Sequence, residues 1–231
     1  MRRFLVVQNR SFGSSVEMYL KTIAELTNER EPVPVTSVAD RLGISTVSAS
    51  EMIHRLEARK LVKHRPYKGV YLTEVGRRKA NGVIRRQRLW ECFLNDVLGI
   101  PWEHVHDFAC QLEHATHPVV TEALADFLEH PSTCPHGNPI PNADGEMPTL
   151  EGVPLANLKP GEKGVILRIH PVSEELVKHL DERGISPGRE IEVTEIAPFN
   201  GPQSIEVGDE VHVLGREVAA HVMIRQTAET S

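Results

Sequence analysis

The chain has 231 residues, of which 40% are hydrophobic and 25% charged, a balance typical of a globular protein with two or three domains. No apolar run approaches the roughly 20 residues that a membrane-spanning helix needs, so we expect no membrane partner. Three cysteines are too few for a disulfide framework and favour a reducing, cytoplasmic location.

The net charge of −6 is unevenly distributed along the chain. Residues 1–88 carry 18 of the 26 lysines and arginines but only 8 of the 32 acidic residues, and the rest of the chain is strongly acidic. A basic first third on an acidic protein indicates that this third meets a polyanion such as nucleic acid.

The first third of the chain predicts a winged helix-turn-helix. Apolar residues recur at helical spacing over residues 14–28. A short helix over 37–43 and a second helix beginning at Thr46 then flank a tight glycine turn, as in DNA-binding helix-turn-helix motifs. Residues 61–73 alternate around Tyr67-Lys68-Gly69, which predicts a basic β-hairpin.

The second helix of this motif begins with short polar side chains, which suit contacts to bases and phosphates in the major groove. Basic residues further along the helix and on the hairpin suit phosphate contacts. The predicted partner is double-stranded operator DNA, and the predicted DNA-binding residues are Ser45, Thr46, Ser48, Ser50, Glu51, Arg55, Arg59, Arg65, Tyr67 and Lys68.

Three further helices are expected over 74–98, 102–116 and 119–129. They carry more apolar surface than a small winged domain needs, which indicates a homodimer interface. Residues 131–150 are rich in Pro, Gly and Asn and are interpreted as a linker. From residue 152 onward, β-branched segments separated by Gly-rich turns predict a small β-barrel-like domain with one short helix.

A set of potential metal ligands shares one helical stripe, at positions i, i+4, i+7 and i+8: His106, Cys110, Glu113 and His114. On the preceding helix, Gln87 and Glu91 are also four residues apart. Imidazole, thiolate and carboxylate groups facing one way favour a metal site, and the alternative is a polar surface with a buried free cysteine. The spacing is neither that of a structural zinc site nor the HExxH of a hydrolase, so no enzyme is indicated.

The chain resembles the diphtheria toxin repressor/manganese transport regulator (DtxR/MntR) family of metal-dependent repressors. The resemblance covers about the first 141 residues. It rests on the helix-turn-helix and on short motifs at Glu17–Leu20, Tyr71–Thr73, Val105–His114 and Pro135–Pro141. Beyond them, the β-rich end resembles the SH3-like (FeoA-type) domain of that family in texture rather than in motif.

The resemblance implies a mainly α-helical protein with a β-rich C-terminus, divided into four parts. These are a winged helix-turn-helix DNA-binding domain at 1–73, a helical metal-binding and dimerisation domain at 74–141, a linker at 142–151 and an SH3-like domain at 152–231.

The resemblance also implies two metal sites per subunit. The primary, regulatory site would consist of Met18, Cys110, Glu113 and His114. The ancillary site would consist of Gln87, Glu91 and His106, with Glu175 or its neighbour Glu174 added from the SH3-like domain. The family usually has histidine where this chain has Gln87, and an amide oxygen is a weaker and harder ligand than imidazole.

The expected function is that of a regulator, most simply a repressor of metal-uptake genes, which binds a palindromic operator as a dimer when loaded with Mn²⁺ or Fe²⁺. Met and Cys ligands favour iron, whereas the missing ancillary histidine and the surplus carboxylates leave manganese open. No organic substrate is expected. The alternative is a winged-helix regulator that senses an organic ligand, with a purely structural His/Cys/Glu stripe, and the metal dependence of operator binding separates the two.

Overall fold

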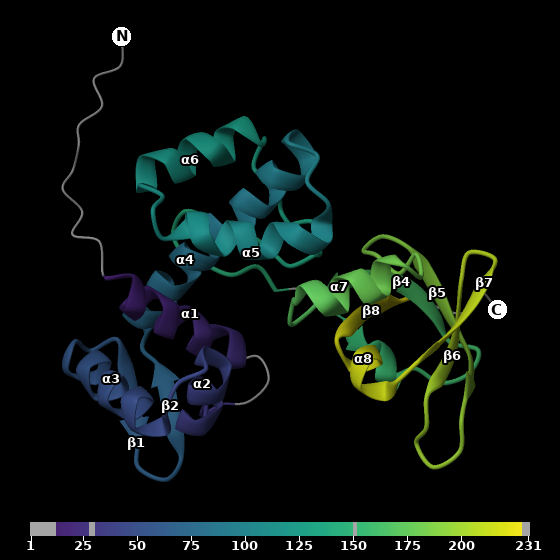
Figure 1. The fold of residues 1–231 in the computed structure, drawn as a ribbon, viewed down its shortest axis with the longest axis horizontal. Coiled ribbons are helices and arrows are strands. Elements are labelled where there is room, and N and C mark those ends of the chain that lie inside the picture. Colours follow the sequence, from purple (N-terminus) through teal and green to yellow (C-terminus); the bar gives the residue numbers. More distant parts are fainter. Residues whose placement is uncertain (1–12, 28–30, 150–151, 228–231) are drawn as a thin grey trace. The chain divides into compact units, whose positions relative to one another are not determined.

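The computed structural model describes residues 13–27, 31–149 and 152–227. Residues 150 and 151, the last two of the linker predicted at 142–151, lie outside these ranges. The described chain forms two compact units (Figure 1). The first contains the residues up to Ile84 together with Ala143–Glu146, and the second contains Arg85–Asn142 and the residues from Met147 onward. No helix in the described ranges is both long enough and apolar enough to cross a membrane.

The first unit is a three-helix motif with a two-stranded wing, as predicted. Its elements are α1 (Ser14–Thr27), α2 (Val35–Leu42), α3 (Thr46–Ala58), β1 (Val62–Arg65) and β2 (Gly69–Leu72). Leu20, Ile53 and Val70 belong to one hydrophobic core, which the three helices share with the wing. The two strands pair antiparallel and place the turn at residues 66–68.

The tight turn between α2 and α3 depends on two residues. Gly43 ends α2 with φ 63°, a left-handed conformation that glycine adopts without strain. Ser45 caps the N-terminus of α3, and its hydroxyl oxygen accepts a hydrogen bond from the backbone N–H of Ser48 at 3.1 Å. These caps fix where the recognition helix begins and leave its polar first turn on the surface.

The helical part follows the predicted order. α4 (Glu74–Cys92) continues as one π-helical turn, η1 (Phe93–Val97), and is followed by α5 (Trp102–Glu113) and α6 (Pro118–Phe127). In the second unit, the end of α4 packs with α6 through Leu89, Leu124 and Ala125. Leu94 of η1 packs with Val105 and Ala109 of α5.

The C-terminal part is a six-stranded antiparallel sheet in the order β3-β8-β4-β5-β6-β7. The strands are β3 (Val153–Pro154), β4 (Lys163–Ile169), β5 (Glu190–Ile196), β6 (Gln203–Val207), β7 (Glu210–Leu214) and β8 (Val222–Gln226). The short helices are η2 (Leu155–Asn157), α7 (Glu174–Asp181) and α8 (Arg216–Ala220). The predicted small β domain with an inserted helix is confirmed.

The linker interpretation is wrong for residues 136–141, because every one of them is buried. This loop joins β4: the N–H of Ile169 donates to the carbonyl of His136 at 3.0 Å, and the amide of Asn138 donates to the carbonyl of Ile169 at 2.8 Å. Gly137 has φ 77°, and a Cβ there would lie 1.9 Å from the carbonyl oxygen of Leu167. Only glycine permits this approach, which positions His136.

Candidate metal centre

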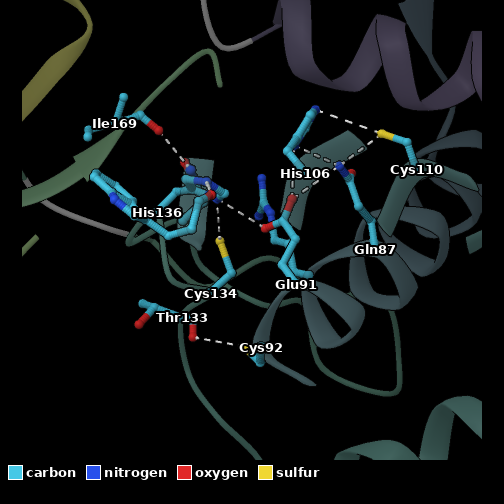
Figure 2. A network of polar contacts seen from close by, with 12 residues as sticks. Gln87, Glu91, Cys92, His106, Cys110, Thr133, Cys134, His136 and Ile169 are labelled. Atoms are coloured by element: carbon cyan, nitrogen blue, oxygen red, sulfur yellow. Dashed lines mark hydrogen bonds and ion pairs between the residues drawn. The ribbon is translucent and has the colours of Figure 1, made fainter. Parts of the chain in front are cut away.

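Glu91, near the end of α4, is the centre of a buried polar network (Figure 2). Its Oε1 lies 2.9 Å from Nδ1 of His106 on α5, and its Oε2 lies 3.4 Å from Nδ1 of His136 in the loop. The Sγ of Cys134 lies 3.8 Å from the same Nδ1 of His136. One carboxylate therefore has an imidazole on each oxygen, and a thiol lies beside the second imidazole.

The hydrogen bonding of His136 shows which of its ring nitrogens is available to a cation. Nε2 lies 2.9 Å from the backbone carbonyl of Trp102, which can only accept, so Nε2 carries a proton. In the neutral ring, the lone pair of Nδ1 then faces the carboxylate of Glu91 and the sulfur of Cys134. Two acceptors that face each other need a proton or a metal ion between them. The carbonyl also orients the ring, as outer partners of metal-binding histidines do, so this donor set fits a metal ion.

The electrostatics of the network are dominated by burial and by the two imidazoles. Burial by itself would raise the pKa of Glu91, but hydrogen bonds and positive charge from His106 and His136 hold this pKa well below its ordinary value. Burial by itself would lower the pKa of His106. The contacts with Cys110 and Glu91 outweigh burial and raise this pKa to about 10.

The pKa of the Cys134 thiol is shifted in the opposite direction to that of Glu91. Burial raises the pKa of Cys134 well above its ordinary value, and the negative charge of Glu91 adds to this effect. Without metal, the thiol therefore keeps its proton at neutral pH. Ligation requires the thiolate, so a metal ion bound at Cys134 would have to displace this proton, and its binding would become weaker as the pH falls.

Glu91, Cys134 and His136 form one of only two groups in the described part of the chain whose His, Cys or carboxylate ligand atoms all lie within 4.8 Å of one another. All three are almost completely buried. Cys134 and His136 are not among the ligands predicted from the sequence, because they lie in a Pro- and Gly-rich segment without helical or strand periodicity. The signal present was the Cys-x-His spacing of Cys134-Pro135-His136.

Gln87 is buried beside Glu91, at the third position predicted for the ancillary site. Its Nε2 lies 3.2 Å from Oε1 of Glu91, 3.0 Å from Nδ1 of His106 and 3.2 Å from Sγ of Cys110. An amide nitrogen donates hydrogen bonds and does not ligate metals. In this orientation, the amide nitrogen of Gln87 positions the surrounding side chains of Glu91, His106 and Cys110. Metal ligation through the amide oxygen would require the amide group to rotate by half a turn.

The predicted primary-site residues belong to two different units. Cys110 and Glu113 lie on α5, and His114 follows at its C-terminal cap. Glu113 is buried, and its Oε1 lies 3.5 Å from Nε2 of His114. Cys110, Glu113 and His114 do not form a group within the same 4.8 Å limit. Met18 lies on α1 in the first unit and is 43% exposed.

The two glutamates predicted as additional ligands lie in the first turn of α7. Oε1 of Glu174 lies 3.1 Å from Nδ1 of His104 on α5, a histidine outside the Glu91 network. Glu175 is exposed. A second contact between α5 and α7 runs from Nε1 of Trp102 to Oδ1 of Asp181, at 2.7 Å.

The predicted DNA-binding residues lie on α3 and the wing, and all are exposed except Ser50, which is half-buried. At the tip of the wing, Tyr67 is fully exposed with φ 62°. The guanidinium of Arg65 stands 5.2 Å from the ring centre of Tyr71, which supports it at the surface. The described geometry therefore leaves this set accessible to DNA, and the individual contacts stay predictions.

The fold and the buried donor set together define a class: winged-helix DNA-binding proteins with a metal centre beside the dimerisation helices. Three family models match the chain in the corresponding order. They are the N-terminal DNA binding domain of iron dependent repressors at residues 11–70, the metal binding and dimerisation domain of iron dependent repressors at 73–142, and the FeoA domain at 153–226.

Individual relatives agree with these matches. The iron-dependent repressor IdeR of Mycobacterium tuberculosis is 32% identical over 224 residues, which cover 92% of this chain and 97% of that protein. The diphtheria toxin repressor of Corynebacterium diphtheriae is 31% identical over 191 residues, which cover 78% and 84%. A solved structure of a manganese-dependent transcriptional repressor with manganese has a TM-score of 0.84 and 32% identity, covering 92% of this chain and 100% of that one.

The chain belongs to the DtxR/MntR family of metal-dependent transcriptional repressors. It is therefore a transcriptional regulator with a DNA-binding domain and a dimerisation domain, and not an enzyme.

Proposed function

We propose that this protein represses transcription by binding a palindromic operator as a homodimer when each subunit is loaded with Fe²⁺ or Mn²⁺ at two sites. The observation that carries the proposal is the buried Glu91 network, in which Nδ1 of His136, the carboxylate and the thiol of Cys134 converge. A metal ion shared by these three buried groups would offset the cost of removing them from water.

The proposed ancillary site consists of Glu91, His106, Cys134 and His136. The ligands come from α4, α5 and the loop, so loading this site holds three elements of the second unit together. Gln87 donates hydrogen bonds to the site in place of the histidine that the family usually has. Glu174 and Glu175 are kept as outer candidates, since α7 contacts α5 through Glu174 and His104.

The proposed primary site consists of Met18, Cys110, Glu113 and His114, by family resemblance. Joint ligation by Met18 and Cys110 would tie the DNA-reading unit to the dimerisation helices. A two-fold dimer reads half-sites about one helical turn apart, so fixing its two recognition helices favours the state that binds the operator. Couplings of this kind typically amount to about 1–3 kcal/mol, or roughly 5–150-fold in affinity.

Fe²⁺ is the preferred effector in this proposal, and Mn²⁺ is the second candidate. Mn²⁺ favours carboxylate and water oxygens, whereas thiolate, thioether and imidazole donors suit the later metals. The proposed sites contain two cysteines, one methionine and three histidines against two carboxylates. The presence of Cys134 and His136 in the network shifts the balance of donors towards iron.

The test measures operator binding by the full chain, on a DNA site selected from random sequence by the metal-loaded protein. Without oxygen, Fe²⁺ should tighten binding by roughly 5–150-fold, and half-maximal activation should require less Fe²⁺ than Mn²⁺. Cys110→Ala and His114→Ala should lose this response. Operator binding that ignores both metals and chelators would instead support the organic-ligand alternative.

A further inference from the structure

A second group of metal-ligand side chains lies within the DNA-binding unit. It consists of His54 and Glu57 on α3 and His64 on β1, whose ligand atoms all lie within 4.8 Å of one another. The recognition helix and the first strand of the wing (Figure 1) each contribute to it. None of these residues belongs to the two sites of the proposed function.

The carboxylate of Glu57 is already held in position between the two histidines. Its Oε1 accepts a hydrogen bond from the backbone N–H of His64 at 2.8 Å. Its Oε2 lies 4.0 Å from Nδ1 of His54, three residues earlier on the same helix face. The imidazole rings of His54 and His64 stand edge to face, with centroids 5.4 Å apart. One oxygen therefore fixes the carboxylate to the wing, and the other faces the imidazole of His54.

Two imidazoles and one carboxylate form a donor set that suits Zn²⁺ and similar ions and leaves a coordination position for water. Ligand atoms at about 2.0–2.2 Å from one tetrahedral ion stand roughly 3.3–3.6 Å apart. Closing the observed spacing therefore needs side-chain movements of about 1 Å. The side chains of His54 and Glu57 are 63% and 41% exposed, so these movements meet little packing resistance.

We propose that His54, Glu57 and His64 bind one transition-metal ion of the Zn²⁺ type, with no thiol ligand. The site would join the recognition helix to the wing, next to two predicted phosphate contacts, Arg55 and Arg65. Its occupancy would thus restrain the two DNA-reading elements relative to each other within one unit, independently of the ligands on α5.

The test counts Zn²⁺ ions bound per full-length chain by equilibrium dialysis at buffered free Zn²⁺. His54→Gln and His64→Gln should each bind one ion fewer than the wild type, and the double variant should lose no more than either single variant. His130→Gln is the matched control, because His130 is exposed and lies 3.4 Å from Asp126 but belongs to no such group. This variant should keep the wild-type count.

Equal counts in the wild type and in both single variants would overturn the proposal. Crystals of the full chain soaked in Zn²⁺ give a second readout that does not depend on variants. An anomalous peak between His54, Glu57 and His64 supports the site, and no peak there at saturating Zn²⁺ rules it out. The Fe²⁺ dependence of operator binding, which Cys110→Ala tests, does not enter these Zn²⁺ measurements. The proposed function and the proposed Zn²⁺ site can therefore be disproved independently of each other.

Discussion

At the scale of single residues, the proposed metal centre depends on Glu91. One helical carboxylate accepts contacts from His106 on one oxygen and His136 on the other, and burial prevents water from replacing either partner. Gln87 completes the environment as a hydrogen-bond donor. In the proposed site, the nitrogen ligand that position 87 lacks comes instead from His136 of the loop, whose Nδ1 lies 3.4 Å from Oε2 of Glu91.

Replacing Cys134 by serine should weaken the ancillary site while preserving side-chain size. Loss of a buried thiolate ligand should lower its metal affinity by at least about 10–100-fold, because even outer partners of metal ligands have effects of this size. Titration with Co²⁺ measures this directly, since thiolate ligation produces a sulfur-to-cobalt charge-transfer band. Cys134→Ser should lose the contribution of one site to the band.

Cys92→Ser is the matched control for this substitution. Cys92 is equally buried, but its Sγ donates to the carbonyl of Thr133 at 3.6 Å, and it belongs to neither group of ligand atoms found in the described residues. It should keep the wild-type titration. A Cys134→Ser protein with an unchanged band would exclude Cys134 as a ligand.

The pKa shifts predict how the stability of the chelator-treated protein depends on pH. The pKa of His106 rises from 6.5 to about 10 on folding, so its stabilising contribution is full below about pH 6.5 and disappears as the pH rises through about 10. The pKa of Glu91 is lowered from 4.5, so its contribution is present above that pH and disappears in acid. Between these limits, both contributions are present together.

Urea unfolding at about pH 6 and about pH 9.5 measures the effect. The free energy of unfolding of the wild type should fall more over this interval than that of His106→Gln, which lacks the titrating group. Identical pH profiles for the two proteins would show that His106 is not held in its charged form by Glu91.

At the scale of elements, the loop at 131–141 is as important to the site as the helices. It supplies Cys134 and His136, and its backbone joins β4 through Ile169. Gly137 makes this possible because no side chain fits between the loop and the carbonyl of Leu167.

Gly137→Ala should destabilise the second unit and weaken the ancillary site together. The new Cβ would lie 1.9 Å from a backbone oxygen at a positive φ, so the loop must move away from β4. Gly161→Ala is the matched control, since Gly161 has φ 86° and open space around its Cβ position. The control should cost about 1–2 kcal/mol in urea unfolding, from backbone strain alone. An equal loss of unfolding free energy in the two variants would contradict the close packing of the loop against β4.

The wing should contribute to DNA affinity without contributing to sequence choice. Arg65→Ala removes an exposed cation from β1, so it should weaken binding to all DNA sequences and reduce the slope of log affinity against log salt by about 0.9. Lys178→Ala, an exposed cation on α7, serves as the control. An unchanged salt slope for Arg65→Ala would remove this residue from the phosphate contacts.

The elements that could be predicted from the sequence are those in which apolar residues recur at the spacing of a helix or a strand. Helical spacing located α1 and α4 through α6, and alternation about the turn at residues 67–69 located the wing. The stripe on α5 likewise placed His106 and Cys110 on one face. The contribution of Cys134 and His136 could not be predicted in this way, because it depends on a loop that returns to Glu91 across more than 40 residues.

At the scale of the whole molecule, the proposed ligands are divided between the two units. Met18 belongs to the unit that carries the recognition helix, and Cys110, Glu113 and His114 belong to the unit that carries the dimerisation helices. In the proposed function, a ligand set drawn from both units would make metal binding and operator binding mutually dependent. By thermodynamic linkage, each must strengthen the other by the same factor.

The most direct test of this linkage is operator affinity measured over a range of buffered free Fe²⁺ under anaerobic conditions. Below saturation, log affinity should rise with log free Fe²⁺, because binding to the operator takes up metal. Operator DNA should in turn lower the Fe²⁺ concentration needed to fill the sites. A slope of zero over the whole range, with metal bound equally in the presence and absence of operator, would contradict metal control of DNA binding.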